Sequence, residues 1–202
     1  MKRLLALACV LLCTTASASE LLTGVRSRLA DPPILRGQFE QKKTVAGFKK
    51  PLLSRGEFLL SRGKGLLWDT RAPFASTLTL TRKSLSAEQK TGGAAYHLDA
   101  SREPALAAMN EFLFALLSGD VGSLSTRFRV EGELVGADGW RLTLTPTDAG
   151  LARVFRGIRL EGDRFVRQVQ LEETSGDSSL IQFTQLAQTP PPSATETERL
   201  GK

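Results

Sequence analysis

Regular alternation of polar and apolar residues between Arg36 and Phe74 constrains the fold of this chain more than any other feature. Phe39 stands among glutamine and glutamate residues, and Phe58 follows Glu57. Successive side chains of a strand point to opposite faces of its sheet, so this spacing gives one polar and one apolar face. A curved antiparallel sheet with aromatic groups on its concave side could hold an apolar guest. No catalytic group stands out in the same stretch, so the pattern predicts a binding surface.

Residues 1–18 have the three parts of an export signal: a positive start, an apolar run from Leu4 to Leu12, and a small-residue cleavage site at 16–18. A helix that spans a bilayer needs about 20 apolar residues, so a retained membrane anchor is the less favoured alternative. Removal of the signal leaves residues 19–202, which suits one domain. Both cysteines lie within the signal, and lipidation at either is also less favoured. The exported chain is therefore expected to be soluble and free of disulfides.

Charge argues against a nucleic-acid partner. Of the 27 basic residues, Lys2 and Arg3 leave with the signal, so 25 remain against 21 acidic residues, a net charge of +4. These charges are spread along predicted strands, which is typical of solvated faces, and no dense basic cluster is present. Two lysine pairs, at 42–43 and 49–50, flank a loop-like segment. They could contact an anionic membrane surface or a partner, although ordinary exposed lysines are the favoured interpretation.

Hydrophobic spacing predicts a helix over residues 21–29, which Pro32 and Pro33 end. A turn is expected at Arg62–Gly65, and glycine and aspartate mark further turns between the later strands. Hairpins that follow one another in this way build an antiparallel sheet or barrel. The alternation predicts strands at 34–42, 53–61, 64–70, 75–82, 83–90, 128–134, 140–145, 158–161, 164–173 and 179–187.

One internal helix is predicted over residues 103–117. Pro104 suits its first turn and Gly119 its end. The favoured interpretation is a core helix that covers one face of the sheet, and the sharper one is a mobile lid over a ligand cavity. Its apolar surface consists of Leu106, Met109, Phe112, Leu113 and Leu116.

The residues that catalysis usually requires are scarce. His97 is the single histidine, and no strained Gly-x-Ser-x-Gly turn accompanies it. Zinc sites usually draw on several His or Cys ligands, which the chain lacks once the signal is removed. The Gly-x-x-x-x-Gly-Lys loop that binds phosphate is also absent from the sequence. The adjacent carboxylates Glu172 and Glu173 would point to opposite faces of a strand, which does not suit a glycosidase. We therefore expect no catalytic residue, no metal and no cofactor, with a lipid hydrolase centred on His97 as a remote alternative.

Four motifs follow one another in a fixed order: Arg36–Gln41, then the Gly-x-Phe strand Gly56–Phe58, then Arg62-Gly63 leading to Trp68, and finally Pro73. This ordered set resembles the LolA family of periplasmic lipoprotein carriers. The resemblance implies an α+β fold that is mainly antiparallel β: an unclosed, strongly curved β-barrel with a helical lid. It also implies that the acyl chains of a lipoprotein lie between barrel and lid.

The resemblance assigns roles to particular residues. Arg62 matches the family arginine that latches the lid to the barrel through hydrogen bonds to helix backbone. Gly63 stands where the family has a proline, so the chain is a divergent member whose cargo could be another lipid. The implied cavity lining is Phe39, Phe58, Leu60, Leu67 and Trp68 from the barrel, with Leu106, Met109, Phe112, Leu113 and Leu116 from the lid.

The sequence therefore predicts a periplasmic carrier, monomeric and not an enzyme, that moves acyl chains of lipoproteins or lipids toward the outer membrane. Its expected partners are an inner-membrane donor and an outer-membrane acceptor. The alternative is a module that binds lipid or senses the envelope without transporting anything. The expected organisation is a signal at 1–18, a carrier domain at 19–188, and a disordered tail at 189–202 that begins with a proline run.

Overall fold

The computed structural model describes residues 18–81, 83–89, 96–99, 114–115 and 120–201. In these residues the strands form one antiparallel sheet of eleven, in the order β6-β5-β4-β3-β2-β1-β11-β10-β9-β8-β7. In chain order they are β1 (Ile34–Thr44), β2 (Leu52–Ser61), β3 (Gly65–Ala72), β4 (Ser76–Thr81), β5 (Ser84–Gln89), β6 (Tyr96–Asp99), β7 (Phe128–Val135), β8 (Gly139–Pro146), β9 (Phe155–Gly162), β10 (Val166–Glu173) and β11 (Ser178–Ala187).

The chain runs from the centre of the sheet to one edge and then from the other edge back to the centre. Strands β1 to β6 follow one another as neighbours, and the chain then starts again at the far edge with β7 and returns to β11. The two halves join where β1 pairs with β11, with Phe39 opposite Phe183. Every predicted strand is confirmed, whereas the short strand β6 was not predicted.

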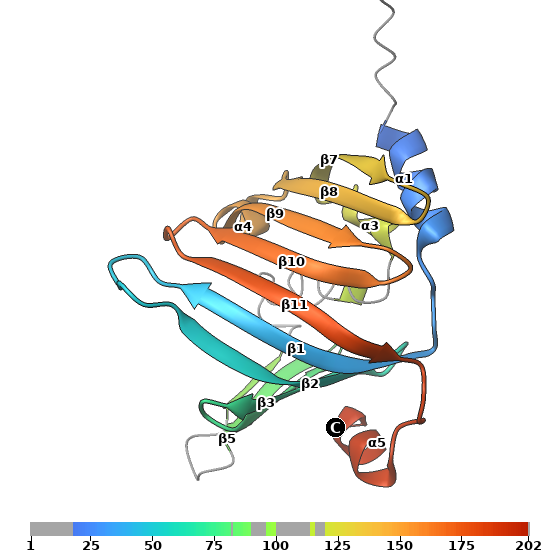
Figure 1. Cartoon of the computed structure of the whole chain (residues 1–202). Helices are drawn as coiled ribbons and strands as arrows, with labels where there is room; N and C mark the ends of the chain where they lie inside the picture. The colour runs from blue at the N-terminus through green and yellow to red at the C-terminus, as the bar shows by residue number, and fades with distance from the viewer. Residues whose placement is uncertain (1–17, 82, 90–95, 100–113, 116–119, 202) are drawn as a thin grey trace, which may run out of the picture.

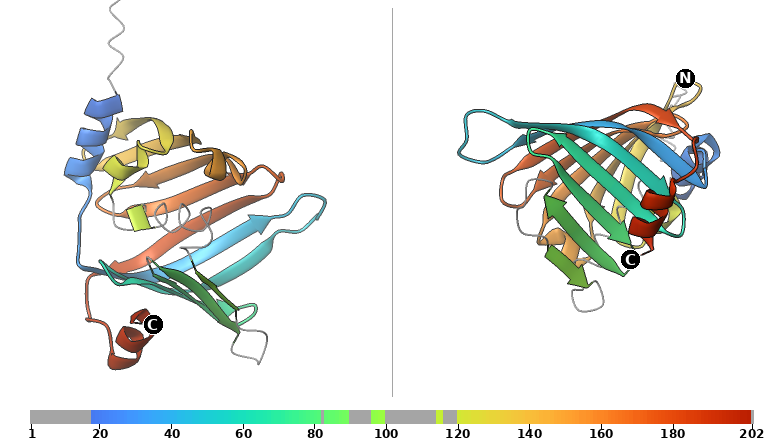
Figure 2. Two further views of the ribbon diagram at one scale, coloured as in Figure 1. Left: turned by 180° about the vertical axis from the view of Figure 1, so that it is seen from behind. Right: turned by 90° about the horizontal axis from the view of Figure 1, so that it is seen from below.

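The sheet curves strongly without closing, because β6 and β7 lie at opposite ends of the strand order (Figure 1). Figure 2 shows α3 (Val121–Leu124) on the concave side and α5 (Ala194–Leu200) on the other side. The expected mainly antiparallel, unclosed curved sheet with a few helices is thus confirmed. We call the concave face, which carries Phe39, the inner face, and the opposite one the outer face.

The two faces differ in chemistry. Buried side chains of the inner face form one apolar core that also includes Val25 of α1 (Ala18–Arg28) and Leu151 of α4 (Ala149–Ala152). The outer face carries ion pairs between neighbouring strands, such as Arg159 with Glu172 and Arg141 with Glu161. Each Å² of apolar surface that is buried on the inner face stabilises the curved sheet by about 25 cal/mol.

Helix α1 confirms the helix predicted over residues 21–29 and packs beside β7. Val25 is fully buried, and the Arg28 guanidinium donates hydrogen bonds to the carbonyl oxygens of Val135 at 3.3 Å and Gly136 at 3.0 Å. These bonds satisfy carbonyls of the β7–β8 turn. No helix within the described residues is long and apolar enough to cross a membrane.

The C-terminal segment differs from our expectation of a disordered tail at 189–202. Residues 194–200 form α5, whose start has a capping box: Ser193 Oγ accepts from the Glu196 amide at 3.2 Å, and Glu196 Oε2 accepts from the Ser193 amide at 2.7 Å. Leu200 is buried on the outer face against Leu59 and Leu67. Our expectation of disorder rested on the proline run and overlooked the Ser-x-x-Glu pattern of Ser193 and Glu196, which is typical of a helix start.

The helix predicted over 103–117 lies outside the described residues, except for Phe114 and Ala115. These two residues are helical, and Ala115 is buried in the inner-face core. The proposed signal at 1–18 lies outside them as well, apart from the first residue of α1.

Candidate functional site

The two Gly-x-Phe segments meet in a reciprocal arrangement at the centre of the inner face. The register of β1 and β2 places Phe39 opposite Gly56, and Gly37 opposite Phe58. A Cβ atom at Gly56 would lie 2.9 Å from Cε1 of Phe39, and one at Gly37 would lie 2.8 Å from Cε1 of Phe58. Each ring therefore extends over the glycine of the neighbouring strand and occupies space that a larger residue there would fill.

Four aromatic rings from adjacent strands form a cluster around this arrangement. Trp68 of β3 stacks on Phe39 with ring centroids 3.8 Å apart and planes inclined by 25°. Phe183 of β11 meets Phe58 edge to face at 5.2 Å and Trp68 at 6.0 Å. Offset stacking and edge-to-face contacts of this kind are each worth about 1 kcal/mol beyond the burial of area. We call Phe39, Phe58, Trp68 and Phe183 the aromatic cluster.

Exposure differs within the aromatic cluster. Phe39, Phe58 and Phe183 retain 1%, 4% and 5% of their accessible surface, whereas Trp68 is half-buried. Trp68 is therefore the ring that a guest molecule can reach with the least rearrangement. Phe183 was missing from the expected lining, although the alternation predicted over 179–187 places it on the same face as Ile181.

Polar groups follow the aromatic cluster along the same face of β1. Gln41 donates to Ser179 Oγ at 3.4 Å, and Lys43 Nζ lies 3.0 Å from Glu173 Oε1 and 3.6 Å from Asp177 Oδ2. The hydrogen bond to Glu173 raises the pKa of Lys43 against the opposing effect of burial, so the ammonium stays charged. The inner face thus changes from aromatic to charged toward the β1–β2 hairpin, a gradient that matches an amphiphile.

Two other residues of the expected cavity lining, Leu60 and Leu67, lie on opposite faces of the sheet. Leu60 is buried in the inner-face core with the aromatic cluster. Leu67 is a correction: it lies on the outer face and contacts Leu59 and Leu200. Leu67 and Trp68 are neighbours in one strand, so their side chains must point to opposite faces.

The expected lid residues Leu106, Met109, Phe112, Leu113 and Leu116 lie outside the described residues, and their role stays a prediction. His97 lies in β6 opposite Ser86, and nothing about its side chain is described. In the described part of the chain, no group of three His, Cys, Asp or Glu side chains could hold a metal ion.

The sequence matches a family model described as "Outer membrane lipoprotein carrier protein LolA-like" over residues 15–198. The chain belongs to this LolA-like family. The resemblance inferred from the motifs between Arg36 and Pro73 is thereby confirmed. No curated protein matches the sequence.

The structure of this LolA-like protein is similar to several solved structures at low sequence identity, and one of them has a TM-score above 0.5. A DUF1329 family protein from Desulfovibrio piger has a TM-score of 0.51 and 11% identity, over 85% of this chain and 92% of that chain. A LolA superfamily protein from Nitrosomonas europaea has a TM-score of 0.47 and 11% identity, over 87% and 94%. The Pseudomonas aeruginosa MucA/MucB complex has a TM-score of 0.37 and 18% identity, over 86% and 59%.

The proposed latch of the LolA-like protein lies in the β2–β3 hairpin. Arg62 Nη2 contacts both the backbone carbonyl oxygen and the carboxylate of Asp31, and the Arg62 amide donates to the Pro33 carbonyl at 2.9 Å. These contacts tie the hairpin to the segment between α1 and β1. A bond from Arg62 to a lid helix stays a prediction.

The backbone conformation at Gly63 suits glycine and not the proline that the family resemblance leads one to expect there. Its φ angle is +77°, in the left-handed region, and nothing lies within 4 Å of the position that a Cβ would take. Proline is fixed near φ −65° and could not adopt this turn. A proline at this position would therefore require a different hairpin geometry next to Arg62.

Proposed function

We propose that this LolA-like protein is a periplasmic carrier, and not an enzyme. In this proposal it holds acyl chains of a lipoprotein or another lipid on its inner face and moves them toward the outer membrane. The observation that carries the proposal is the aromatic cluster, with four rings from four adjacent strands on the concave side of an unclosed sheet. The family description and the predicted export signal support the direction of transport.

Burial of acyl chains supplies enough free energy for such a complex. Each methylene removed from water contributes about 0.8 kcal/mol. Contact of about ten methylenes with the inner face would contribute about 8 kcal/mol before the costs of ordering. The three phenylalanines are buried in this structure, so loading requires the inner face to open. A carrier needs this opening to be reversible, because it must also release its cargo.

The gradient along β1 supports one orientation of the guest. Its apolar chains would lie over Phe39 and Trp68, and its polar head would lie toward Gln41 and Lys43. The reverse orientation would bury a polar head among aromatic rings, which costs several kcal/mol without hydrogen-bond partners.

Native mass spectrometry of protein purified gently from the periplasm tests whether lipid is bound. We expect a lipid adduct on the wild-type protein and on Leu53→Glu, since Leu53 is 65% exposed on the outer face. We expect the adduct to be lost from Trp68→Glu, which adds the same charge to the inner face. An unliganded wild-type protein, or equal adducts on the two variants, would count against the proposal.

A transfer assay separates the carrier from the alternative, a module that binds lipid without transporting it. Loaded protein is mixed with acceptor vesicles made from outer membranes, and the lipid remaining on the protein is followed over time. A carrier loses its lipid to the vesicles, whereas a module that only binds lipid retains it.

A further inference from the structure

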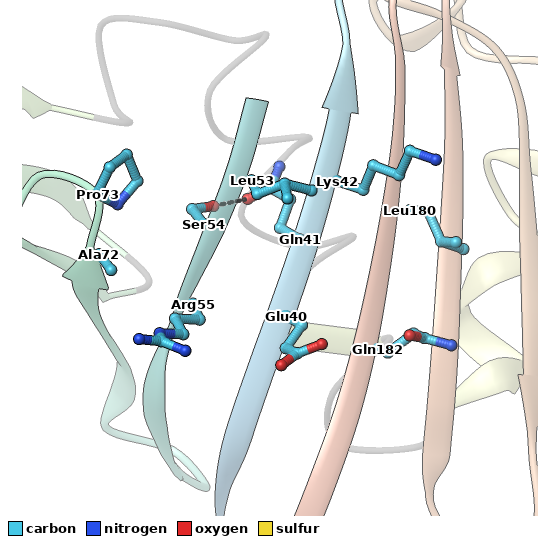
Figure 3. Close-up of a pocket in the computed structure, with 10 residues that line it drawn as sticks. All are labelled: Glu40, Gln41, Lys42, Leu53, Ser54, Arg55, Ala72, Pro73, Leu180 and Gln182. Atoms are coloured by element: carbon cyan, nitrogen blue, oxygen red, sulfur yellow. Dashed lines mark hydrogen bonds between the residues drawn. The ribbon is translucent and has the colours of Figure 1, made fainter. Parts of the chain in front are cut away.

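A pocket lies on the outer face, on the side of the sheet opposite the aromatic cluster. It has a volume of about 420 Å³ and is formed by β1, β2, β11 and the end of β3 (Figure 3). Leu53, Pro73 and Leu180 supply apolar surface, and Glu40, Lys42 and Arg55 supply charges. The register places Glu40 opposite Arg55 and Lys42 opposite Leu53, so these four side chains share one face.

The charged side chains of this outer pocket stand apart from the ion pairs that the structure describes on the same face. Among the described residues, Glu40, Lys42 and Arg55 make no ion pair, whereas Arg71 lies 2.7 Å from Glu57 and Arg36 lies 2.8 Å from Glu196 on the same face. Figure 3 shows the three side chains on adjacent strands with no interaction drawn between them. Charged groups that lack partners beside an apolar surface are available to a ligand.

Exposed apolar side chains lie both in the outer pocket and next to it. Leu53 is 65% exposed, and next to the pocket Phe74 follows Pro73 with 82% exposure. Lys49 and Lys50, in the turn between β1 and β2, add two cations near this end of the sheet. A protein surface that combines exposed aliphatic and aromatic groups with unpaired charges is typical of an interaction site.

The mixture of charges indicates the kind of ligand. Two cations attract carboxylates, and Glu40 would oppose a uniformly anionic surface such as a phospholipid bilayer but could accept a hydrogen bond from a peptide amide or a basic group. The apolar surface of Leu53, Pro73 and Leu180 suits an aliphatic side chain. Strands β1, β2 and β11 already pair on both edges, so a peptide could not join the sheet and must be recognised by side chains.

We propose that the outer pocket binds an acidic segment of a partner protein, with its carboxylates on Lys42 and Arg55 and an aliphatic side chain on Leu53 and Pro73. This site is independent of the proposed acyl-chain site, because the two lie on opposite faces of the same sheet. A loaded carrier could therefore engage a donor or acceptor through the outer pocket without disturbing its cargo.

Photo-crosslinking in the native host tests this proposal directly. A benzophenone amino acid replaces Leu53 in the full-length chain, and adducts formed in living cells are mapped by mass spectrometry. A second protein carries the same group at Val154, an exposed residue next to α4. The Leu53 experiment is repeated with Lys42→Glu and Arg55→Glu together, and with the matched pair Arg129→Glu and Arg153→Glu, which makes the same charge change elsewhere.

We expect a protein adduct at position 53, absent at 154, whose crosslinked segment contains Asp or Glu beside an aliphatic residue. The yield should fall about ten-fold in the Lys42 and Arg55 variant, as for the loss of about 1.4 kcal/mol, and stay unchanged in the matched pair. Native mass spectrometry should show unaltered lipid loading in both variants, which separates this test from that of the carrier proposal. A lipid adduct, an adduct with a second copy of this chain, no adduct, or insensitivity to charge reversal would overturn it.

Discussion

The ring of Phe39 lies over Gly56 of the neighbouring strand, and the space that a side chain would occupy at Gly56 is filled by Cε1 of that ring. Gly37 and Phe58 repeat this relationship in the opposite direction. The glycines of the two Gly-x-Phe segments thus have a packing role, because they let two aromatic rings lie close to the sheet and leave Trp68 stacked above Phe39.

Gly56→Ala should destabilise the fold. The added Cβ would lie 2.0 Å from the backbone oxygen of Asp69, so a strand as well as the Phe39 ring must move. Overpacking of this kind typically costs about 1–3 kcal/mol. Gly157→Ala in β9 is the control, since its Cβ would meet only Leu144 O, at 3.7 Å. Urea unfolding should show a clear loss of stability for the first variant alone, and equal stabilities would contradict the packing role.

Gly63→Pro should destabilise the β2–β3 hairpin, although proline is the residue expected there from the family. The φ of +77° is inaccessible to proline, and forcing the turn to change would move Arg62 away from Asp31. Incompatible proline substitutions commonly cost about 3 kcal/mol. Gly63→Asn, which tolerates the left-handed region, should retain most of the melting temperature. A proline variant as stable as the asparagine variant would refute this account of the turn.

Docking of α5 should weaken in acid. Hydrogen bonds from the Arg36 guanidinium, at 2.9 and 2.8 Å, lower the pKa of Glu196 from 4.5 to about 2. The ionised carboxylate therefore contributes stability that is fully present above pH 4.5 and is lost as the pH falls toward about 2. The protection factors of the α5 amides, which correct the hydrogen-exchange rates for the intrinsic effect of pH, should fall as the pH decreases over this range in the wild type.

Glu196→Gln is the control for this pH effect. It should exchange faster already at neutral pH, with a loss of about 1 kcal/mol, and show little further change in acid. A wild-type helix whose protection does not depend on pH in this range would mean that the ion pair does not hold α5.

Arg62→Leu should slow the release of cargo without preventing its loading. If Arg62 is the latch of a lid, its loss changes the balance between closed and open states. Transfer to acceptor vesicles should be several-fold slower, as followed by the lipid that remains bound. Asp31→Ala keeps the backbone carbonyl that Arg62 contacts and should transfer cargo normally. Normal transfer by the Arg62 variant would exclude the latch.

Alternation was a reliable guide to the strands because the sheet has one apolar and one charged face. The same rule, applied residue by residue, would have placed the side chains of Leu67 and Trp68 on opposite faces of the sheet. The expected cavity lining did not apply the rule to these two residues. Phe183 was missed for a different reason: its place beside Phe58 depends on the pairing of β1 with β11, which joins segments far apart in the sequence.

The C-terminal helix could have been predicted in part from its local sequence, although the proline run before it suggested disorder. The proline run suggested disorder, yet Ser193 and Glu196 form a capping box, and Leu200 finds an apolar site made by Leu59 and Leu67. That site exists only after β2 and β3 have paired, so the sequence near residue 200 could not reveal it. The outer pocket is likewise a product of register, since its charges come from separate strands.

Quenching of Trp68 fluorescence by dibromostearic acid tests the central claim most directly, because bromine atoms quench an indole that they contact. We predict saturable quenching of the wild-type protein, and much weaker quenching of Trp68→Phe, in which the buried Trp140 is the remaining tryptophan. Leu53→Glu, altered on the outer face, should behave as the wild type. Binding of the fatty acid with equal quenching in wild type and Trp68→Phe, or with none in either, would show that acyl chains do not lie on the aromatic cluster.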